Sequence, residues 1–377
     1  MQFRFFSLFT GTRKHGIIYK LYHQEMTALL KSLSKKIANA VFLAVVFGLT
    51  LWSVFRGENL TQVLFHLKSV NILYILPAVG CVLLYILADA VSIFFLLRTL
   101  SVQIPLPRCC LYSFIGFFYC CVTPSASGGQ PMQVLYMRKG GIPVAVSTVV
   151  LAIITIVYKL VLVLATCLIL LLRPAGLMCH LEPVKTLVYL GLGLNAVCII
   201  ALIFLVFYPS IVRMLAEKTF LLIHRIHPMK HLSRRQTQLE LILRQYQGTA
   251  AYYRSHKREL FCIFIIALLQ RLSLFLVTWF TYRSFSLSGS SLPLITGLQA
   301  MISMAADVLP LPGGMGVSEN MFLEIFPAIF GEDLVLPGMM ISRGISYYTQ
   351  LVISAIMTVC AHILLMRRPS QKTTAKR

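Results

Sequence analysis

Two stretches rich in glycine and proline interrupt otherwise apolar sequence, at 123–131 (TPSASGGQP) and at 309–319 (LPLPGGMGVSE). Hydrocarbon offers no water to backbone N–H and C=O groups, so unwound chain at membrane depth persists only inside protein or beside a wet cavity. One such break in each half of an apolar chain is typical of a transport site. We therefore expect a transporter-like membrane protein with a polar cavity at its breaks.

The composition also indicates a membrane protein. Apolar residues make up 58% of the 377 residues and charged residues only 12%, whereas a soluble domain carries about 25% charged residues. The formal net charge is +22, but the basic residues lie between the apolar segments. This distribution is typical of membrane topology next to anionic lipid, so we expect no nucleic-acid partner.

Six apolar segments are long enough to cross a hydrocarbon core, which requires about 20 helical residues. They are 37–55, 70–97, 146–172, 186–207, 260–282 and 337–366. Two further regions, 109–137 and 291–330, contain the breaks. The apolar arm 111–122 reaches only about 18 Å as a helix, against a core of about 30 Å, so we expect it to enter, unwind and return.

The second region is interpreted in the same way, because its return arm 321–330 reaches only about 15 Å as a helix. Residues 291–309 alone are long enough for a full crossing, and a crossing out and back gives the same loop placement. The predicted fold is an all-α polytopic membrane protein with about six full spans and two re-entrant or broken helical hairpins in inverted arrangement.

The basic residues predict the orientation. With a cytoplasmic N-terminus and two hairpins that do not cross, 26 of the 34 Lys and Arg residues are cytoplasmic, 5 are external and 3 lie within spans. If the first hairpin crossed, the ten basic residues of 208–258 would move outside, against the positive-inside rule. We expect a plasma-membrane protein with both termini cytoplasmic. The first hairpin then opens from the cytoplasm and the second from the exterior.

Three parts of the chain follow from this pattern: a basic cytoplasmic arm at 1–36, a membrane domain at 37–366 and a basic cytoplasmic tail at 367–377. Within the domain, 208–258 places apolar residues at helical spacing among basic ones, which is typical of amphipathic helices in the headgroup layer. Two interpretations carry equal weight: recruitment of anionic phospholipid, or an ordinary positive-inside loop.

Ionisable side chains within spans cost roughly 2.5–3.5 kcal/mol each on insertion scales, so they require a reason. Mutual pairing that locks the helices together is one reason, and a ligand path is the other. Because several of these charges converge on the two breaks, we favour a polar path for a lipid or its head group. Arg271 and Glu324 are also ionisable but stand outside this set. The candidates for the path are Asp89, Lys159, Asp307, Glu319 and Arg343.

The breaks have a backbone role in this hypothesis. The pairs Gly128–Gly129 and Gly313–Gly314 let the chain take positive φ and approach a bound group closely. Helix ends beside the breaks offer N–H groups to a phosphate, with Lys159 and Arg343 as counter-charges. The break residues are Pro124, Ser125, Gly128, Gly129, Gln130, Pro131, Pro310, Pro312, Gly313, Gly314 and Gly316. No nucleotide-binding loop, zinc-protease motif or nucleophile elbow is present, so we expect no catalytic residue, metal or cofactor.

Four motifs carry a family resemblance. They are PS with GGQP at 124–131, RKGG at 138–141, PLPGGMGVSE at 310–319 and R-x-x-SYY at 343–348. Over about 38–366 the chain resembles the transmembrane domain of lysylphosphatidylglycerol synthases of the multiple peptide resistance factor type. The family often has Glu at the position of Gln130, and Arg, frequently after Glu, at the position of Lys159. These departures put the head-group contact or coupling role of that Glu in question here, or imply a different substrate.

The resemblance implies a division of labour. In complete members a soluble domain transfers lysine from lysyl-tRNA to phosphatidylglycerol, and the membrane domain moves the product to the outer leaflet. This chain ends 11 residues after Met366, so we expect a membrane domain without the transferase.

The predicted function is translocation of an aminoacyl-phosphatidylglycerol-like phospholipid, or of a lipid-linked head group, between leaflets. The alternatives are phosphatidylglycerol lysyltransfer, a membrane partner for a separately encoded synthase or transferase, and a small-solute transporter with Asp89 or Asp307 as proton relay.

Overall fold

A computed structural model describes residues 65–66, 70–123, 126–174, 176–208, 210–214, 217–219, 232–307, 309 and 311–366. All of them belong to one of the two compact units of the chain, 54–377. The predicted arm 1–36, the predicted first span 37–55 and the tail 367–377 lie outside the described residues, as do Pro124, Ser125 and Pro310.

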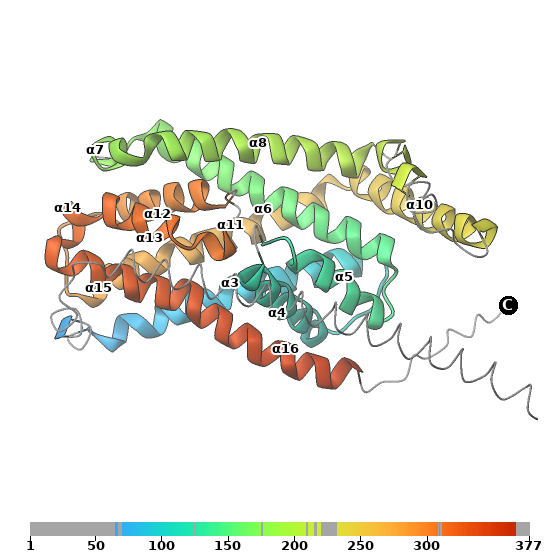
Figure 1. Cartoon of the computed structure of the whole chain (residues 1–377), viewed down its shortest axis with the longest axis horizontal. Coiled ribbons are helices and arrows are strands. Elements are labelled where there is room, and N and C mark those ends of the chain that lie inside the picture. Colours follow the sequence, from blue (N-terminus) through green and yellow to red (C-terminus); the bar gives the residue numbers. More distant parts are fainter. Residues whose placement is uncertain are drawn as a thin grey trace, which may run out of the picture. The chain divides into compact units, whose positions relative to one another are not determined.

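The described chain is helical and contains no strand. Its elements are α3 (Ile72–Thr99), α4 (Leu106–Val122), α5 (Gly129–Lys139), α6 (Val144–Leu172), α7 (Leu177–Leu181), η2 (Glu182–Val184), α8 (Lys185–Phe207), α10 (Leu232–Ser255), α11 (Lys257–Ser284), α12 (Leu292–Ala306), η3 (Pro312–Gly314), α13 (Val317–Ile325), α14 (Pro327–Phe330), α15 (Glu332–Arg343), η4 (Gly344–Thr349) and α16 (Gln350–Met366). Figure 1 shows these helices in sequence colours.

Five helical stretches among the described residues are long and apolar enough to cross a membrane: Ile72–Thr99, Val144–Leu172, Leu177–Phe207, Lys257–Ser284 and Glu332–Ile363. They coincide with five of the six predicted spans. The all-α, polytopic fold class is thereby confirmed for the part of the chain that the structure describes.

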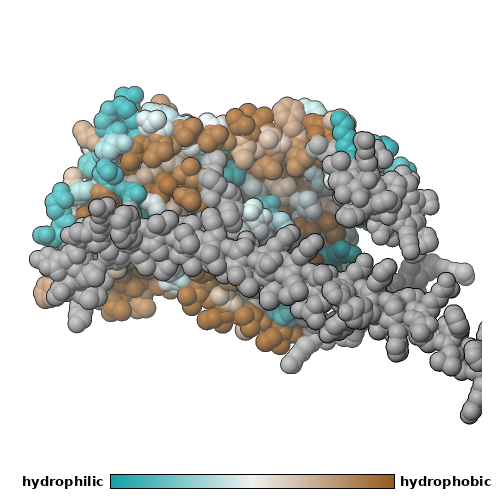
Figure 2. Space-filling model, viewed as in Figure 1, coloured by the Kyte–Doolittle hydropathy of each residue, from teal (hydrophilic) through white to brown (hydrophobic). Residues whose placement is uncertain are grey.

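The outer surfaces of these helices are apolar. The stripe formed by Val352, Ile356, Val359 and Ile363 on α16 recurs at helical spacing and is 47–61% exposed. Much of the apolar surface of α8 is exposed as well. In Figure 2 hydrophobic residues cover much of the coloured surface between hydrophilic ends. Such surfaces suit contact with lipid rather than with water.

The first break lies in a helical hairpin made by α4 and α5. The arms have 17 and 11 residues, about 25 Å and 16 Å as helices. They pack closely through glycine, because a Cβ on Gly129 would lie 2.2 Å from Cys120 Sγ and 2.8 Å from the carbonyl oxygen of Gly116. The first hairpin is therefore held by tight contact between its arms.

The expected positive φ at Gly128 and Gly129 is wrong. Gly128 has φ −81° and Gly129 begins α5, whereas Ala126 takes the positive φ, at 52°. The physical need for glycine here is space. A Cβ on Gly128 would lie 2.6 Å from Cγ2 of Thr123, and a Cβ on Gly129 would clash with Cys120 and Gly116 of α4.

The second break lies between α12 and α13, which have 15 and 9 residues. Here the expectation of positive φ is correct, with φ of 58° at Gly313, 67° at Gly314 and 84° at Gly316. Three residues with positive φ in a short stretch reverse the direction of the chain. Residues other than glycine rarely adopt this left-handed conformation. The result is a second helical hairpin, followed by α14 and the helix α15.

The two hairpins lie toward opposite ends of the long helices. Figure 1 shows α4 and α5 on the side where α10 lies, and α12, α13 and α14 near α7. The second break contacts the first hairpin, because η3 packs against α4. The hydroxyl of Tyr347 in η4 also donates to the carbonyl oxygen of Cys121 at 3.0 Å. The fold thus brings both breaks to one place between the long helices.

The basic helix α10 packs partly against protein. Leu243, Tyr246, Ala250 and Tyr253 are buried, and α10 contacts α6, α8 and α11. The hydroxyl of Tyr253 donates to the carbonyl oxygen of Leu96 at 2.6 Å. This side of the apolar face is therefore occupied by other helices rather than by headgroups.

Candidate functional site

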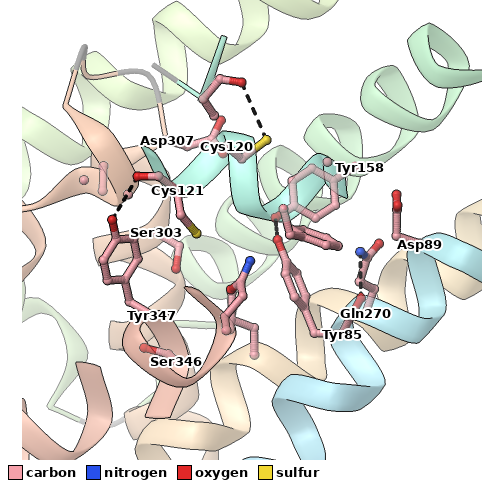
Figure 3. A pocket seen from close by; sticks show the side chains of 18 of the residues that line it. Tyr85, Asp89, Cys120, Cys121, Tyr158, Gln270, Ser303, Asp307, Ser346 and Tyr347 are labelled. Atoms are coloured by element: carbon pink, nitrogen blue, oxygen red, sulfur yellow. Dashed lines mark hydrogen bonds between the residues drawn. The ribbon is translucent and has the colours of Figure 1, made fainter. Parts of the chain in front are cut away.

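A cavity of about 490 Å³ lies between the two breaks. Residues from α3, α4, α6, α11, α12 and η4 line it, together with both breaks (Figure 3). The first break contributes Ala126, Ser127 and Gln130, and the second contributes Leu309, Leu311, Gly313 and Gly314. Both breaks therefore form part of the wall of the same cavity.

Lys159 and Asp307 meet at one side of this cavity, and Arg271, which is buried and does not line it, lies behind them. Lys159 Nζ of α6 forms an ion pair with Oδ2 of Asp307, directly after α12. Arg271 Nη2 of α11 reaches Oδ1 of the same carboxylate at 3.4 Å. Lys159 also donates to Asn195 Oδ1 of α8 at 3.0 Å. One carboxylate thus serves two cations, and the cluster carries a formal charge of +1.

Arg271 is held by an aromatic stack as well. Its guanidinium lies 3.5 Å from the ring centroid of Tyr158, a cation–π contact that is strong where water is excluded. The Tyr158 hydroxyl is 2.6 Å from that of Tyr85 on α3. Arg271 is only 3% exposed, and its Nε has no hydrogen-bond partner among the described residues. Its charge is therefore fixed in place from two sides.

Arg343 and Glu319 form a second ion pair that holds the second break. Arg343 Nε lies 2.7 Å from Glu319 Oε1, and its Nη2 donates to the carbonyl oxygen of Gly313 at 2.9 Å. The other oxygen of Glu319 accepts the N–H of Gly316 at 2.8 Å, which satisfies one of the free N–H groups at the start of α13. Arg343 lines the cavity, whereas Glu319 lies behind it and is 3% exposed.

Asp89 of α3 stands apart from these pairs. Its Oδ2 accepts the Ser113 hydroxyl of α4 at 2.6 Å and lies 3.5 Å from Gln133 Nε2 of α5. Among the described residues no Lys, Arg or His forms an ion pair with it; the described ion pairs involve other carboxylates. Figure 3 shows Asp89 and Asp307 on opposite sides of the cavity.

The structure therefore places the five path candidates in three groups: Lys159 with Asp307, Arg343 with Glu319, and Asp89 by itself. All but Glu319 line the cavity. Pairing and cavity lining, which the sequence presented as alternatives, occur together for three of the five. Glu324 is exposed and belongs to none of the groups.

The remaining break residues serve different roles. Gln130 lines the cavity and donates to the hydroxyl of Thr155 on α6. Pro131 is exposed in the first turn of α5. Pro312 lies in η3. Gly316 supplies the backbone N–H that Glu319 accepts.

Several lining residues were not anticipated from the sequence: Tyr85, Tyr158, Gln270, Ser303, Ser346 and Tyr347. Gln270 had a detectable signal, since an amide within an apolar helix needs a partner; its Nε2 donates to the carbonyl oxygen of Tyr85 at 3.0 Å. Tyr85 and Tyr158 gave no such signal, because aromatic residues are ordinary in membrane helices. Ser346 and Tyr347 belong to the R-x-x-SYY motif at 343–348, which carried the family resemblance without indicating a place in the cavity.

The comparison with protein families gives one match. A family model described as the lysylphosphatidylglycerol synthase TM region matches residues 39–354, which is well over half of the chain. It includes both breaks and every residue that lines the cavity. The comparison with curated proteins gives no match.

Proposed function

The chain belongs to the family of lysylphosphatidylglycerol synthase transmembrane regions, and from that premise we propose that it moves a phospholipid between the leaflets of a membrane. The cargo is an aminoacyl-phosphatidylglycerol-like lipid or another lipid-linked head group. Its polar head passes through the cavity between the breaks, while its acyl chains stay in hydrocarbon.

One observation supports this proposal above the others: a polar, charge-lined cavity at the meeting point of two helical hairpins in an apolar bundle. A charged group at the centre of a bilayer is costly, so a head group needs a substitute for water along its way. Lys159 lines the cavity and supplies positive charge for a phosphate. Arg343 holds the second break in shape, and that break supplies backbone that a ligand can approach closely.

The short hairpin arms suit a re-entrant placement. None of them reaches the roughly 30 Å of a hydrocarbon core, and the hairpins lie toward opposite ends of the long helices. We propose that the first opens from the cytoplasm and the second from the exterior, with both termini cytoplasmic. The basic residues of 208–258 then face the cytoplasmic leaflet, where α10 keeps Leu241 and Ile242 exposed for anionic lipid.

Leaflet exchange in vesicles tests the proposal. The purified chain is reconstituted with a fluorescent aminoacyl-phospholipid, and a membrane-impermeant quencher reports how fast the inner leaflet is depleted. We expect exchange well above that of protein-free vesicles, and slower exchange in Arg343→Gln. Exchange equal to that of protein-free vesicles, for several head groups, would count decisively against translocation.

Lysyl transfer is the enzymatic alternative that the family description raises. Incubating the purified chain with lysyl-tRNA and phosphatidylglycerol distinguishes it from translocation, and we expect no lysylated product. A membrane partner for a separate synthase or transferase is the other alternative. Co-purification of such an enzyme, together with no lipid movement by the chain alone, would favour that role.

A further inference from the structure

We propose that the cavity recognises its head group at two separate points, with Asp89 as a subsite for an ammonium group. The inference rests on the proposed function in taking a phospholipid as ligand. It adds that the head group must carry a cation beyond its phosphate. A zwitterionic or aminoacylated phospholipid meets this requirement, and an anionic one such as phosphatidylglycerol does not.

The first point is the cationic side of the cavity. Lys159 and Arg271 share the single carboxylate of Asp307, and Asn195 and Tyr158, their other partners, are neutral. One positive charge is therefore in excess, and Lys159, which lines the cavity, presents it there, whereas Arg271 is buried behind the wall. A phosphate at this side would neutralise the excess.

The pair of Arg343 and Glu319 contributes little to the charge balance. It is neutral as a pair, and its polar atoms are used within the second break, on the backbone of Gly313 and Gly316. It defines the shape of the cavity wall and leaves the net charge to the other two groups.

The second point is Asp89. Ser113 and Gln133 are its hydrogen-bond partners and both are uncharged, so an ionised Asp89 carries a negative charge without a cation among the described residues. A carboxylate in a membrane protein is costly unless it is paired. An ammonium group would supply the missing charge and form short, charge-assisted hydrogen bonds to the carboxylate.

The surroundings of Asp89 also suit an ammonium group. Tyr85 lies one helical turn before Asp89 on α3, and both line the cavity. The ring of Phe117 lies 5.0 Å from that of Tyr85, centroid to centroid, and lines the cavity as well. Aromatic faces beside a carboxylate are a recurrent environment for ammonium ligands.

The two points lie on opposite sides of the cavity, with Tyr158 between them (Figure 3). Charge is thus separated across the space into which a head group fits. A ligand with a phosphate near one end and an ammonium near the other matches this separation. A head group with only a phosphate leaves the Asp89 charge unpaired, which weakens its binding.

Competitive binding of matched lipids to the purified full-length chain tests the inference. The probes are phosphatidylethanolamine and N-acetyl-phosphatidylethanolamine with identical acyl chains; acetylation removes the ammonium charge and leaves the phosphate. Bound lipid is quantified by native mass spectrometry. We expect wild-type protein to prefer phosphatidylethanolamine by about tenfold, equivalent to about 1.4 kcal/mol, and Asp89→Asn to show no preference.

Glu182→Gln is the matched control, because it also removes one carboxylate, but from an exposed ion pair with Lys185 outside the cavity. It should keep the wild-type preference. The inference is overturned if wild-type protein does not discriminate between the two lipids, if Asp89→Asn keeps the preference, or if both variants lose it. If Asp89→Asn does not fold, equal binding of the two lipids by wild-type protein would still overturn the inference.

Vesicle exchange, measured separately on wild-type protein, keeps the two proposals distinguishable. A lipid preference that depends on Asp89 without any leaflet exchange would support the ammonium subsite and contradict translocation. Leaflet exchange without a preference for phosphatidylethanolamine would support translocation and contradict the ammonium subsite.

Discussion

Asp307 pairs with two cations, Lys159 and Arg271, that are far apart in the sequence. Removing the carboxylate of Asp307 and removing the ammonium of Lys159 should have different consequences. The Asp307 carboxylate is 19% exposed, so its pairing is only partly screened by solvent. Without it, Lys159 and Arg271 would face each other unpaired. Without Lys159, by contrast, Asp307 would still be neutralised by Arg271.

We therefore predict that Asp307→Asn lowers the free energy of unfolding by about 2 kcal/mol, somewhat below the range for a fully buried pair, because some water reaches the site. Lys159→Met should cost less than half of that, yet slow lipid exchange, since it removes the excess positive charge. Thermal unfolding in detergent and vesicle exchange measure the two effects. Greater destabilisation by Lys159→Met than by Asp307→Asn would refute this account of the cluster.

Gly313 combines positive φ with close contact to an aromatic ring. A Cβ on Gly313 would lie 2.0 Å from Cε2 of Tyr347, so the ring would have to move and its hydroxyl would leave the carbonyl oxygen of Cys121. That hydrogen bond links η4 to the end of α4, which leads into the first break.

We predict that Gly313→Ala slows lipid exchange at least tenfold. Gly141→Ala is the matched control, because Gly141 has φ 93° and no atom within 4 Å of a built Cβ. Gly141→Ala places an alanine in a backbone conformation with positive φ, which costs roughly 1–2 kcal/mol, but it causes no steric clash. Similar exchange rates in the two variants would mean that the hydrogen bond between Tyr347 and Cys121 is unimportant for exchange.

At the scale of elements, the two hairpins use glycine for different physical reasons. The break between α12 and α13 needs left-handed backbone, whereas α4 and α5 need close approach of two helices. From the sequence both appeared as paired glycines beside proline, and a common reason was expected. The difference arises because contact between helices depends on a partner that the local sequence does not specify.

Gly129→Ala tests the packing of the first hairpin. Its Cβ would press against the backbone of α4, which cannot move aside as a flexible side chain can, so we predict a loss of about 1–3 kcal/mol in the free energy of unfolding. Gly80→Ala in α3 is the control, because nothing lies within 4 Å of its built Cβ.

Gly80→Ala should be neutral or stabilise the protein by up to about 1 kcal/mol, since alanine is favoured over glycine in helices. Chemical denaturation of the two variants in the same detergent makes the comparison. A neutral Gly129→Ala would contradict the tight contact.

The π-helical turn η4 is a further element, and it was not predicted from the sequence. It interrupts the helix between α15 and α16, and Ser346 and Tyr347 within it line the cavity beside Arg343. Such turns are frequent at functional sites. Here the turn lies where the helix passes the second break, so it contributes to the cavity wall.

At the scale of the whole molecule, the positive-inside count makes a testable statement about orientation. In a cysteine-free background, we predict that Glu182→Cys, at the start of η2, is labelled by an impermeant maleimide in intact cells. Glu240→Cys on α10 should be labelled only after permeabilisation. Both side chains are exposed. Labelling in the opposite pattern would invert the proposed orientation of both hairpins.

Several features were determined by the sequence alone. Apolar length predicts the spans from α3 to α16, because a hydrocarbon core demands about 20 helical residues whatever the fold. The two glycine- and proline-rich stretches predict hairpins, since arms this short cannot cross. The cost of charge in apolar surroundings singled out five path candidates: Asp89, Lys159, Asp307, Glu319 and Arg343, of which all but Glu319 line the cavity.

Only the tertiary structure decided which of these groups meet. Lys159 and Asp307 are 148 residues apart, and Tyr347 and Cys121 are 226 apart. Helices that are apolar on all sides do not reveal which side faces inward, so no local pattern could pair these residues. The same holds for Asp89, because whether a carboxylate finds a cation depends on which helices pack around it.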